Sequence, residues 1–336
     1  CFIYETMIPQ QVHLSHRRNS CILGLLSDGE RFAAPHSPFV KEFRIMARTL
    51  LVTGASGQLG RLVREDLLAR PSEDTIIALT RSPERLRAAF PSAKRLEIRE
   101  ADFDREDGLA AAFFGANRVL LISTDALDRP GRRLEQHKRA IEAAAAAGVT
   151  HLVYTSVTNP VADSPLPLAD DHRRTEEALA ASSLGHTILR VGWWLDNYLG
   201  ALPSAFESGA LVAAASTGKA NFINREDTAR AAAAALAAAF EGRRTLNIVG
   251  PTPIDHRALA AAASAAFGKP LAYVAVAGGD KQKALEAFLP PPVAALLVGF
   301  DLAVARGDFD VSSSDFRELT GREPLSAESF FAKSTG

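Results

Sequence analysis

Cysteine is almost absent from this chain of 336 residues. Its two cysteines are Cys1 and Cys21, so the chain beyond position 21 carries no thiol. This absence excludes a thiol nucleophile, a cysteine-ligated zinc ion and an iron–sulfur cluster from the main body of the protein. The chain also lacks a secretory pattern, and we therefore expect a cytoplasmic protein.

An excess of one charge and long apolar runs are missing as well. The 38 basic and 39 acidic side chains give a net charge of −1. Binding to nucleic acid through its phosphates needs a basic surface, so we expect no nucleic-acid partner. The apolar run of residues 231–240 is too short for a membrane span, which needs about 20 residues. We therefore expect no membrane span.

The first 45 residues differ from the rest because they have no sustained helical or strand periodicity. Met46 then begins Met-Ala-Arg-Thr-Leu-Leu-Val-Thr-Gly, as dinucleotide-binding domains commonly do. We interpret residues 1–45 as an upstream extension that arises from a misassigned start or an expression artefact. A targeting or partner-binding arm is the alternative.

From Met46 onward, apolar strands alternate with helical patterns. We expect strands at 49–53, 75–79, 95–99, 118–122, 151–155, 186–191 and 245–249, and helices at 58–69, 83–90, 104–114 and 134–147. This alternation predicts an α/β fold, a Rossmann-type doubly wound parallel sheet over residues 46–250.

After Val191 the alternation loosens. We expect helices at 254–267, 281–288 and 293–306 and a strand at 271–276. These elements predict a smaller α+β region over residues 251–336, to which the chain contributes from about residue 192. Such a region would cap the carboxyl ends of the strands, where open α/β sheets bind ligands.

A glycine-rich turn follows the first strand and leads into a helix. Gly54 permits the tight turn, Gly57 lets the backbone approach a pyrophosphate, and Gly60 lets helix and strand pack closely. The helix N-terminus offers free N–H groups to the phosphates. We expect the whole loop to bind the cofactor: Gly54, Ala55, Ser56, Gly57, Gln58, Leu59 and Gly60.

The residues after the next strands indicate which dinucleotide is bound. Where an NAD enzyme would carry an acid for the ribose, this chain has Arg81, whose planar guanidinium can pair with a 2′-phosphate. Arg81 therefore favours NADP over NAD, and a solvated surface arginine is the alternative. We expect Asp102 and Phe103 near the adenine, and Ser123 and Thr124 along the path of the ribose and nicotinamide.

The acid–base pair of ketone-reducing short-chain dehydrogenases is missing, because no tyrosine is followed by lysine four residues later. His172 and Glu176 stand in the expected places. His172 is a candidate proton donor, although a surface residue is the alternative. Two classes of function remain: hydride transfer to an acceptor that needs no positioned acid, such as a quinone, and non-catalytic sensing of NADP.

Aromatic residues follow the sixth strand. Gly192 allows a close backbone approach, while Trp193, Trp194 and Tyr198 either wall a flat pocket beside the nicotinamide or pack between the two regions. The sequence leaves both roles open.

Taken together, these motifs resemble the NmrA-like atypical short-chain dehydrogenases, above all their quinone oxidoreductase type 2 and triphenylmethane reductase members. The likeness runs from Met46 to the end of the chain. It rests on the glycine loop, Arg81-Ser-Pro83, Ala101-Asp-Phe103, Leu121-Ile-Ser123, residues 147–156, Leu168-Ala-Asp-Asp-His172 and residues 315–324.

The resemblance implies NADPH binding and reduction of quinones to hydroquinones without flavin or metal. It adds Asp125 and the segment of Val191, Gly192, Trp193, Trp194, Leu195 and Asp196 to the cofactor site. For the substrate pocket we expect Tyr154, Trp193, Trp194, Tyr198, Asn221 and Phe222.

The same family leaves two questions open. Its relatives in this subgroup carry Asn where this chain has Val191, a change that can alter the acceptor preference. The family also contains redox-sensing regulators, which are the alternative function. A planar small molecule is the expected partner, and a homodimer is an assembly that the sequence leaves open.

Overall fold

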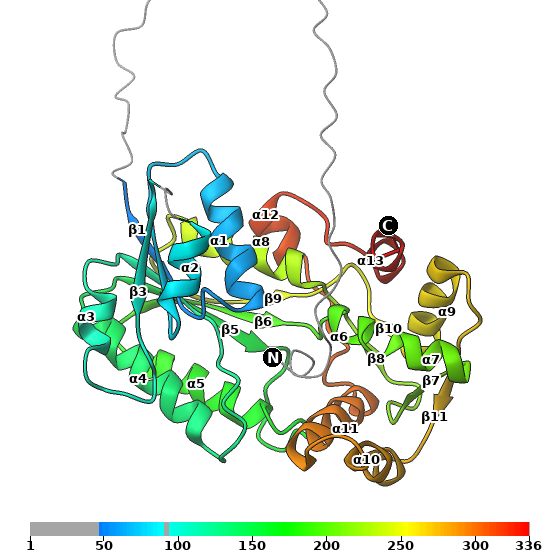
Figure 1. Ribbon diagram of the computed structural model, residues 1–336. Coiled ribbons are helices and arrows are strands. Elements are labelled where there is room, and N and C mark those ends of the chain that lie inside the picture. The colour runs from blue at the N-terminus through cyan, green and yellow to red at the C-terminus, as the bar shows by residue number, and fades with distance from the viewer. Residues whose placement is uncertain (1–46, 91–93, 336) are drawn as a thin grey trace, which may run out of the picture. The chain divides into compact units, whose positions relative to one another are not determined.

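Seven parallel strands form the central sheet of the computed structural model, which describes residues 47–90 and 94–335 (Figure 1). In order of pairing they are β3 (Leu96–Glu100), β2 (Thr75–Thr80), β1 (Thr49–Val52), β4 (Arg118–Leu121), β5 (His151–Val157), β6 (Gly185–Val191) and β9 (Arg243–Ile248). The order reverses between β1 and β4, and in open α/β sheets such a reversal creates a ligand-binding crevice at the carboxyl ends of the strands. The predicted Rossmann-type sheet is confirmed, whereas the interpretation of residues 1–45 lies outside the described residues.

Helices cover both faces of the sheet because successive strand residues point to opposite sides. Leu50 and Val52 of β1 pack on one side and Leu51 on the other. The first side is covered by α1 (Gln58–Ala69), α2 (Pro83–Ala89), α8 (Arg225–Ala237) and α12 (Asp315–Thr320). The second is covered by α3 (Leu109–Phe113), α4 (Arg132–Ala146) and α5 (Ala169–Ala181) (Figure 1). Burial on both faces explains why the inner strands β1, β2 and β4 are rich in apolar residues.

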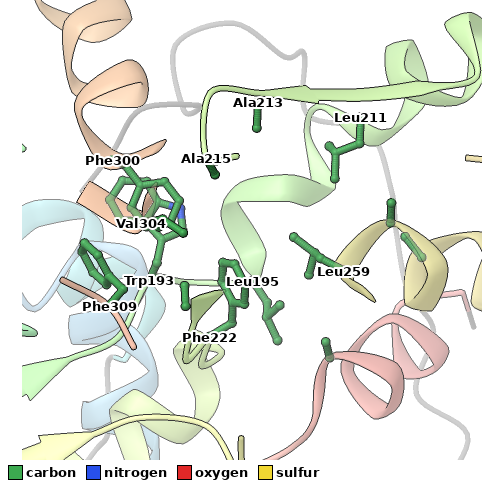
Figure 2. Close-up of a cluster of buried hydrophobic side chains, with 14 of the residues drawn as sticks. Trp193, Leu195, Leu211, Ala213, Ala215, Phe222, Leu259, Phe300, Val304 and Phe309 are labelled. Carbon is green, nitrogen blue, oxygen red and sulfur yellow. The ribbon is translucent and has the colours of Figure 1, made fainter. Parts of the chain in front are cut away.

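The remaining elements form what we call the small lobe. It contains α6 (Asp196–Leu199), α7 (Leu202–Ser208), β7 (Ala210–Ala213), β8 (Lys219–Ala220), β10 (Ile254–Asp255), α9 (His256–Phe267), β11 (Ala272–Ala275), α10 (Gly278–Glu286), α11 (Pro291–Arg306) and α13 (Ala327–Lys333). β11 pairs with β7 and β10 with β8, so segments far apart in the sequence build this lobe together. Its apolar core holds Trp193, Phe222, Phe300 and Phe309 (Figure 2). The predicted boundaries at about residues 192 and 250 stay predictions.

One predicted helix begins later than expected. The pattern predicts a helix from residue 104, but α3 begins at Leu109. The Asp104 carboxylate accepts hydrogen bonds from Arg132 and Gln136, which holds this segment as a loop. Gly108 then adopts a φ of 86°, a left-handed conformation outside the helix. Tertiary contacts have therefore overridden the local pattern.

Two structural properties bear on the classes of protein considered above. None of the helices in the described part of the chain combines the length and apolar character that crossing a bilayer requires. Within residues 47–90 and 94–335, no group of three His, Cys, Asp or Glu side chains is arranged to hold a metal ion.

Candidate cofactor and substrate site

The glycine loop connects β1 to α1 at the carboxyl edge of the sheet. Gly54 has a φ of 56°, which favours glycine, and its carbonyl oxygen accepts the Gly57 N–H at 2.9 Å. A Cβ atom on Gly60 would come within 2.2 Å of the Gly54 carbonyl oxygen, so only glycine fits where α1 meets the loop. Gly54 and Ser56 are exposed at this edge, whereas Ala55, Leu59 and Gly60 are buried beneath it. This cradle fits the pyrophosphate of a dinucleotide.

A buried arginine that the sequence analysis did not single out supports this loop. Arg64 is 2% exposed, and its Nη1 donates to the Ala55 carbonyl oxygen at 3.1 Å. Its guanidinium also lies over the Phe90 ring, 4.4 Å from the centroid. The spacing of nine residues from the loop carries no motif signal, so this support can be recognised only in the structure.

The carboxyl end of β2 lies next to the loop. Ser56 Oγ and Thr80 Oγ1 are 2.8 Å apart, and the exposed Arg81 follows Thr80 directly. After β3, Asp102 and Phe103 are half-buried, and the Phe103 ring packs near Phe113 with 6.4 Å between centroids. The structure thus brings Arg81 to the same edge as the glycine loop.

The turn after β4 is held by hydrogen bonds to side chains of β5 and α4. The Ser123 N–H donates to Thr155 Oγ1 at 2.9 Å. The Thr124 N–H donates to His137 Nε2 at 3.0 Å, while Arg133 Nε donates to the Thr124 carbonyl oxygen at 2.7 Å. Asp125, the third predicted residue of this turn, is exposed.

Two further predicted residues lie behind this turn, inside the protein. Tyr154 is fully buried on β5, and its hydroxyl is 2.8 Å from His172 Nδ1. His172 is 5% exposed on α5, and its Nε2 lies 2.9 Å from Arg133 Nη2. Burial raises the pKa of Tyr154, and burial together with the Arg133 charge holds the pKa of His172 well below its usual range. Their assigned roles, in the pocket and as a proton donor, stay predictions.

The chain after β6 makes the close approach that Gly192 was expected to allow. A Cβ on Gly192 would come within 2.3 Å of the Asn221 carbonyl oxygen. Val191 is buried at the end of the strand. Leu195 is also buried, and the Asp196 carboxylate accepts the Arg225 N–H at 2.9 Å.

The two tryptophans have different surroundings. Trp193 stacks on Phe300 with 3.8 Å between ring centroids, inside the core of the small lobe (Figure 2). The sequence left open whether Trp193 walls a pocket or packs between the two regions, and these contacts are packing contacts. Trp194 is only half-buried; its Nε1 donates to Thr228 Oγ1 at 3.0 Å and the Arg225 guanidinium covers its ring.

The residues expected at the substrate mouth are largely enclosed. Tyr198 and Phe222 meet edge to face, with 5.7 Å between centroids, and the Tyr198 hydroxyl lies 3.0 Å from His256 Nε2. The Asn221 Nδ2 donates to the Val311 carbonyl oxygen, whereas its Oδ1 is buried without a hydrogen-bond partner among the described residues. His256 was not singled out from the sequence, because nothing in its neighbourhood forms a motif.

A cavity of about 390 Å³ lies beyond the end of β9. It is lined by Gly250, Pro251, Ser312, Ser313, Ser314, Phe316, Arg317, Glu323 and Pro324. None of these residues was predicted for the site.

The glycine cradle, Arg81 and the turns after β4 and β6 all lie at the carboxyl edge of one parallel sheet, which defines a nicotinamide-dinucleotide-binding protein. Comparison with known proteins agrees with this class. A family model described as NAD(P)H-binding matches residues 54–239, more than half of the chain. The chain belongs to this NAD(P)H-binding family, and its NmrA-like character is confirmed.

Several characterised proteins are similar over most of their length. Quinone oxidoreductase 2 of Escherichia coli (strain K12) is 35% identical over 81% of this chain and 93% of its own. The crystal structure of the Escherichia coli NADPH-dependent quinone oxidoreductase complexed with NADPH superimposes with a TM-score of 0.79 at 33% identity, covering 85% of this chain and 100% of that one. The Citrobacter sp. triphenylmethane reductase complexed with NADP(H) gives 0.77 at 31% identity, with coverages of 85% and 100%.

These likenesses confirm three expectations: an oxidoreductase, a Rossmann fold and a nicotinamide cofactor. The protein is an NAD(P)H-dependent oxidoreductase. The transcriptional regulator NmrA also shares the fold, with a TM-score of 0.68, but at 14% identity that likeness concerns the fold alone.

Proposed function

We propose that this protein is an NADPH-dependent reductase that transfers a hydride directly to quinone-like planar acceptors, without flavin or metal. The observation that carries the proposal is the glycine cradle at the crevice between β1 and β4, with Arg81 on the neighbouring strand end. The 35% identity to a quinone oxidoreductase along nearly its whole length supports the choice of acceptor.

In this proposal the cradle of residues 54–60 binds the pyrophosphate, and Arg81 pairs with the 2′-phosphate. The turn of residues 123–125 and the segment of residues 191–196 place the nicotinamide. When bound, the reduced nicotinamide supplies a hydride, that is, two electrons and a proton. The chain's own contribution is to orient the reactants, which is worth roughly 7–11 kcal/mol in favourable cases.

The reaction needs no positioned acid. A quinone that accepts a hydride becomes an aromatic hydroquinone anion, which takes its second proton from solvent. This agrees with the surroundings of His172, whose ring nitrogens are both engaged inside the protein.

The test is anaerobic oxidation of NADPH by the full chain, with and without a small naphthoquinone, and with NADH for comparison. NADPH deuterated at the transferable position should give deuterium-dependent rates, and the purified protein should show no flavin absorbance. Tight binding of NADPH without turnover of any quinone would instead favour a redox sensor.

A further inference from the structure

A network of buried polar side chains lies behind the turn of residues 123–125. Its members are Arg133 and His137 on α4, Tyr154 on β5, and His172 and Thr175 on α5, and none is more than 5% exposed. Buried polar groups destabilise a protein unless their hydrogen bonds are satisfied, so a network of five such side chains suggests a specific role. It reaches toward the cofactor site at one residue, Thr124, whose N–H and carbonyl oxygen it both binds.

The donor and acceptor properties of the side chains fix the positions of the protons in this network. A guanidinium only donates, so Arg133 Nη2 donates to His172 Nε2, which must be unprotonated. A neutral His172 then carries its proton on Nδ1 and donates it to the Tyr154 hydroxyl oxygen, 2.8 Å away.

The second histidine has the same tautomer for a similar reason. The Thr124 backbone N–H donates to His137 Nε2, so His137 carries its proton on Nδ1, 3.0 Å from Thr175 Oγ1. Thr175 in turn donates to the Asp171 carbonyl oxygen at 2.7 Å. The Tyr154 hydroxyl also lies 3.4 Å from His137 Nδ1, which links the two histidines.

We propose that His172 is a positioning residue and not the proton donor. With Tyr154 it fixes the Arg133 guanidinium, and Arg133 and His137 together hold the Thr124 peptide groups in the shape that receives the nicotinamide half of NADPH. The proposal rests on the proposed function, in which the turn of residues 123–125 contacts the cofactor.

The charges around His172 agree with a neutral ring. It faces Arg133 and His137 from α4 and Tyr154 from β5, and Asp171 precedes it on α5. The Asp171 carboxylate is 3.9 Å from Arg133 Nη1, which has no hydrogen-bond partner among the described residues. Burial and the Arg133 charge hold the pKa of both histidines well below its usual range.

The test compares His172→Leu, His172→Gln and the wild-type full chain. We expect His172→Leu to weaken NADPH binding about tenfold, the loss of one buried hydrogen bond. The value of kcat at saturating NADPH should stay within about threefold, because no proton donor has been lost. His172→Gln, whose Oε1 can accept from Arg133, should restore most of the affinity.

The matched control is His151→Leu, which removes a buried histidine at the amino end of β5, the opposite edge of the sheet. It should leave the NADPH affinity unchanged. The pH profile of kcat, from about pH 5.5 to 8.5, should have the same shape in wild type and His172→Leu. A loss of kcat of about a hundredfold at unchanged NADPH affinity, or an inflection that disappears with His172, would mean a proton donor and overturn the proposal.

A second variant covers the case in which His172→Leu does not fold. Tyr154→Phe keeps the ring and removes only the hydroxyl that holds His172; it should weaken NADPH binding about threefold to fivefold, and unchanged binding overturns the proposal. If the wild type binds NADPH but reduces no quinone, the proposed function fails while these affinities still decide the positioning role. A wild type that binds no NADPH refutes both.

Discussion

Arg64 is fastened to Ala55 by a hydrogen bond of 3.1 Å from its guanidinium to the backbone carbonyl oxygen. Ala55 belongs to the glycine loop, and Arg64 lies on the helix that this loop begins. The helix therefore supports, through a buried side chain, the loop that leads into it.

We expect Arg64→Met to lower the free energy of unfolding by about 1.5–3 kcal/mol and to weaken NADPH binding, because a buried charge-assisted hydrogen bond is lost. Chemical denaturation and NADPH titration measure the two effects. Arg61→Met, on the exposed side of the same helix and paired with the exposed Glu65, should change stability by less than about 0.5 kcal/mol. Normal cofactor affinity in Arg64→Met would contradict the bracing role.

Gly60→Ala tests the closeness of helix and loop. The added Cβ would lie 2.2 Å from the Gly54 carbonyl oxygen, so the loop must shift away from its cradle shape. We expect NADPH affinity to fall by more than about tenfold, since the pyrophosphate contacts depend on this backbone. Gly279→Ala on α10 is the control; its Cβ meets no atom within 4 Å, and a helical alanine there should slightly stabilise the protein.

Arg81→Gln tests the dinucleotide preference. If Arg81 pairs with the 2′-phosphate, kcat/KM for NADPH should fall about tenfold to a hundredfold, whereas that for NADH should change by less than about threefold. Steady-state rates with both dinucleotides measure the ratio. Arg85→Gln, at an exposed arginine in the first turn of α2, should leave the ratio unchanged. Equal losses for both cofactors in Arg81→Gln would point to a structural role.

The buried His256 predicts a dependence of stability on pH. Burial lowers its pKa to about 4, so the folded protein keeps the ring neutral while the unfolded chain takes up a proton below about pH 6.5. The contribution of the neutral ring to the free energy of unfolding is complete above pH 6.5 and is lost as the pH falls toward 4, a change of about 3 kcal/mol. Among the nearby charges, Asp301 and Asp255 raise the pKa of His256 and Lys281 lowers it, and burial outweighs them.

His256→Gln removes this titration. In urea unfolding, the free energy of unfolding of the wild type relative to that of His256→Gln should fall by about 3 kcal/mol as the pH is lowered from 7 to 4. A difference that does not depend on pH would show that His256 is not neutralised by folding.

The sequence predicted the sheet well because each strand and helix carries its own periodic signal. Helix α1 runs over the predicted residues 58–69, and the glycine spacing located the cradle. α3 was predicted too early because Asp104, the first residue of the predicted helix, is held in a loop by Arg132 and Gln136 of α4. Arg133, His137 and Tyr154 could not be grouped from the sequence, since only the packing of α4 against β5 and α5 brings them together.

The aromatic residues after β6 show a second limit. Trp193 and Trp194 are neighbours in the chain, yet one stacks on Phe300 in the lobe core and the other lies half-buried beside Arg225. The sequence left open whether they wall a flat pocket or pack between the two regions, and nothing local distinguishes their partners. The partner of Trp193 comes from a helix more than a hundred residues later.

The path of the chain restricts how the small lobe can move relative to the sheet. After β6 the chain enters the small lobe, returns to the sheet for α8 and β9, leaves again for β10 and α9, and returns once more for α12, which packs on α8 and β9. A hinge built on one or two linkers permits wide opening, whereas here every connecting segment would have to bend at once. We therefore expect ligands to enter and leave through side-chain and loop adjustments rather than through a hinged opening of the two regions.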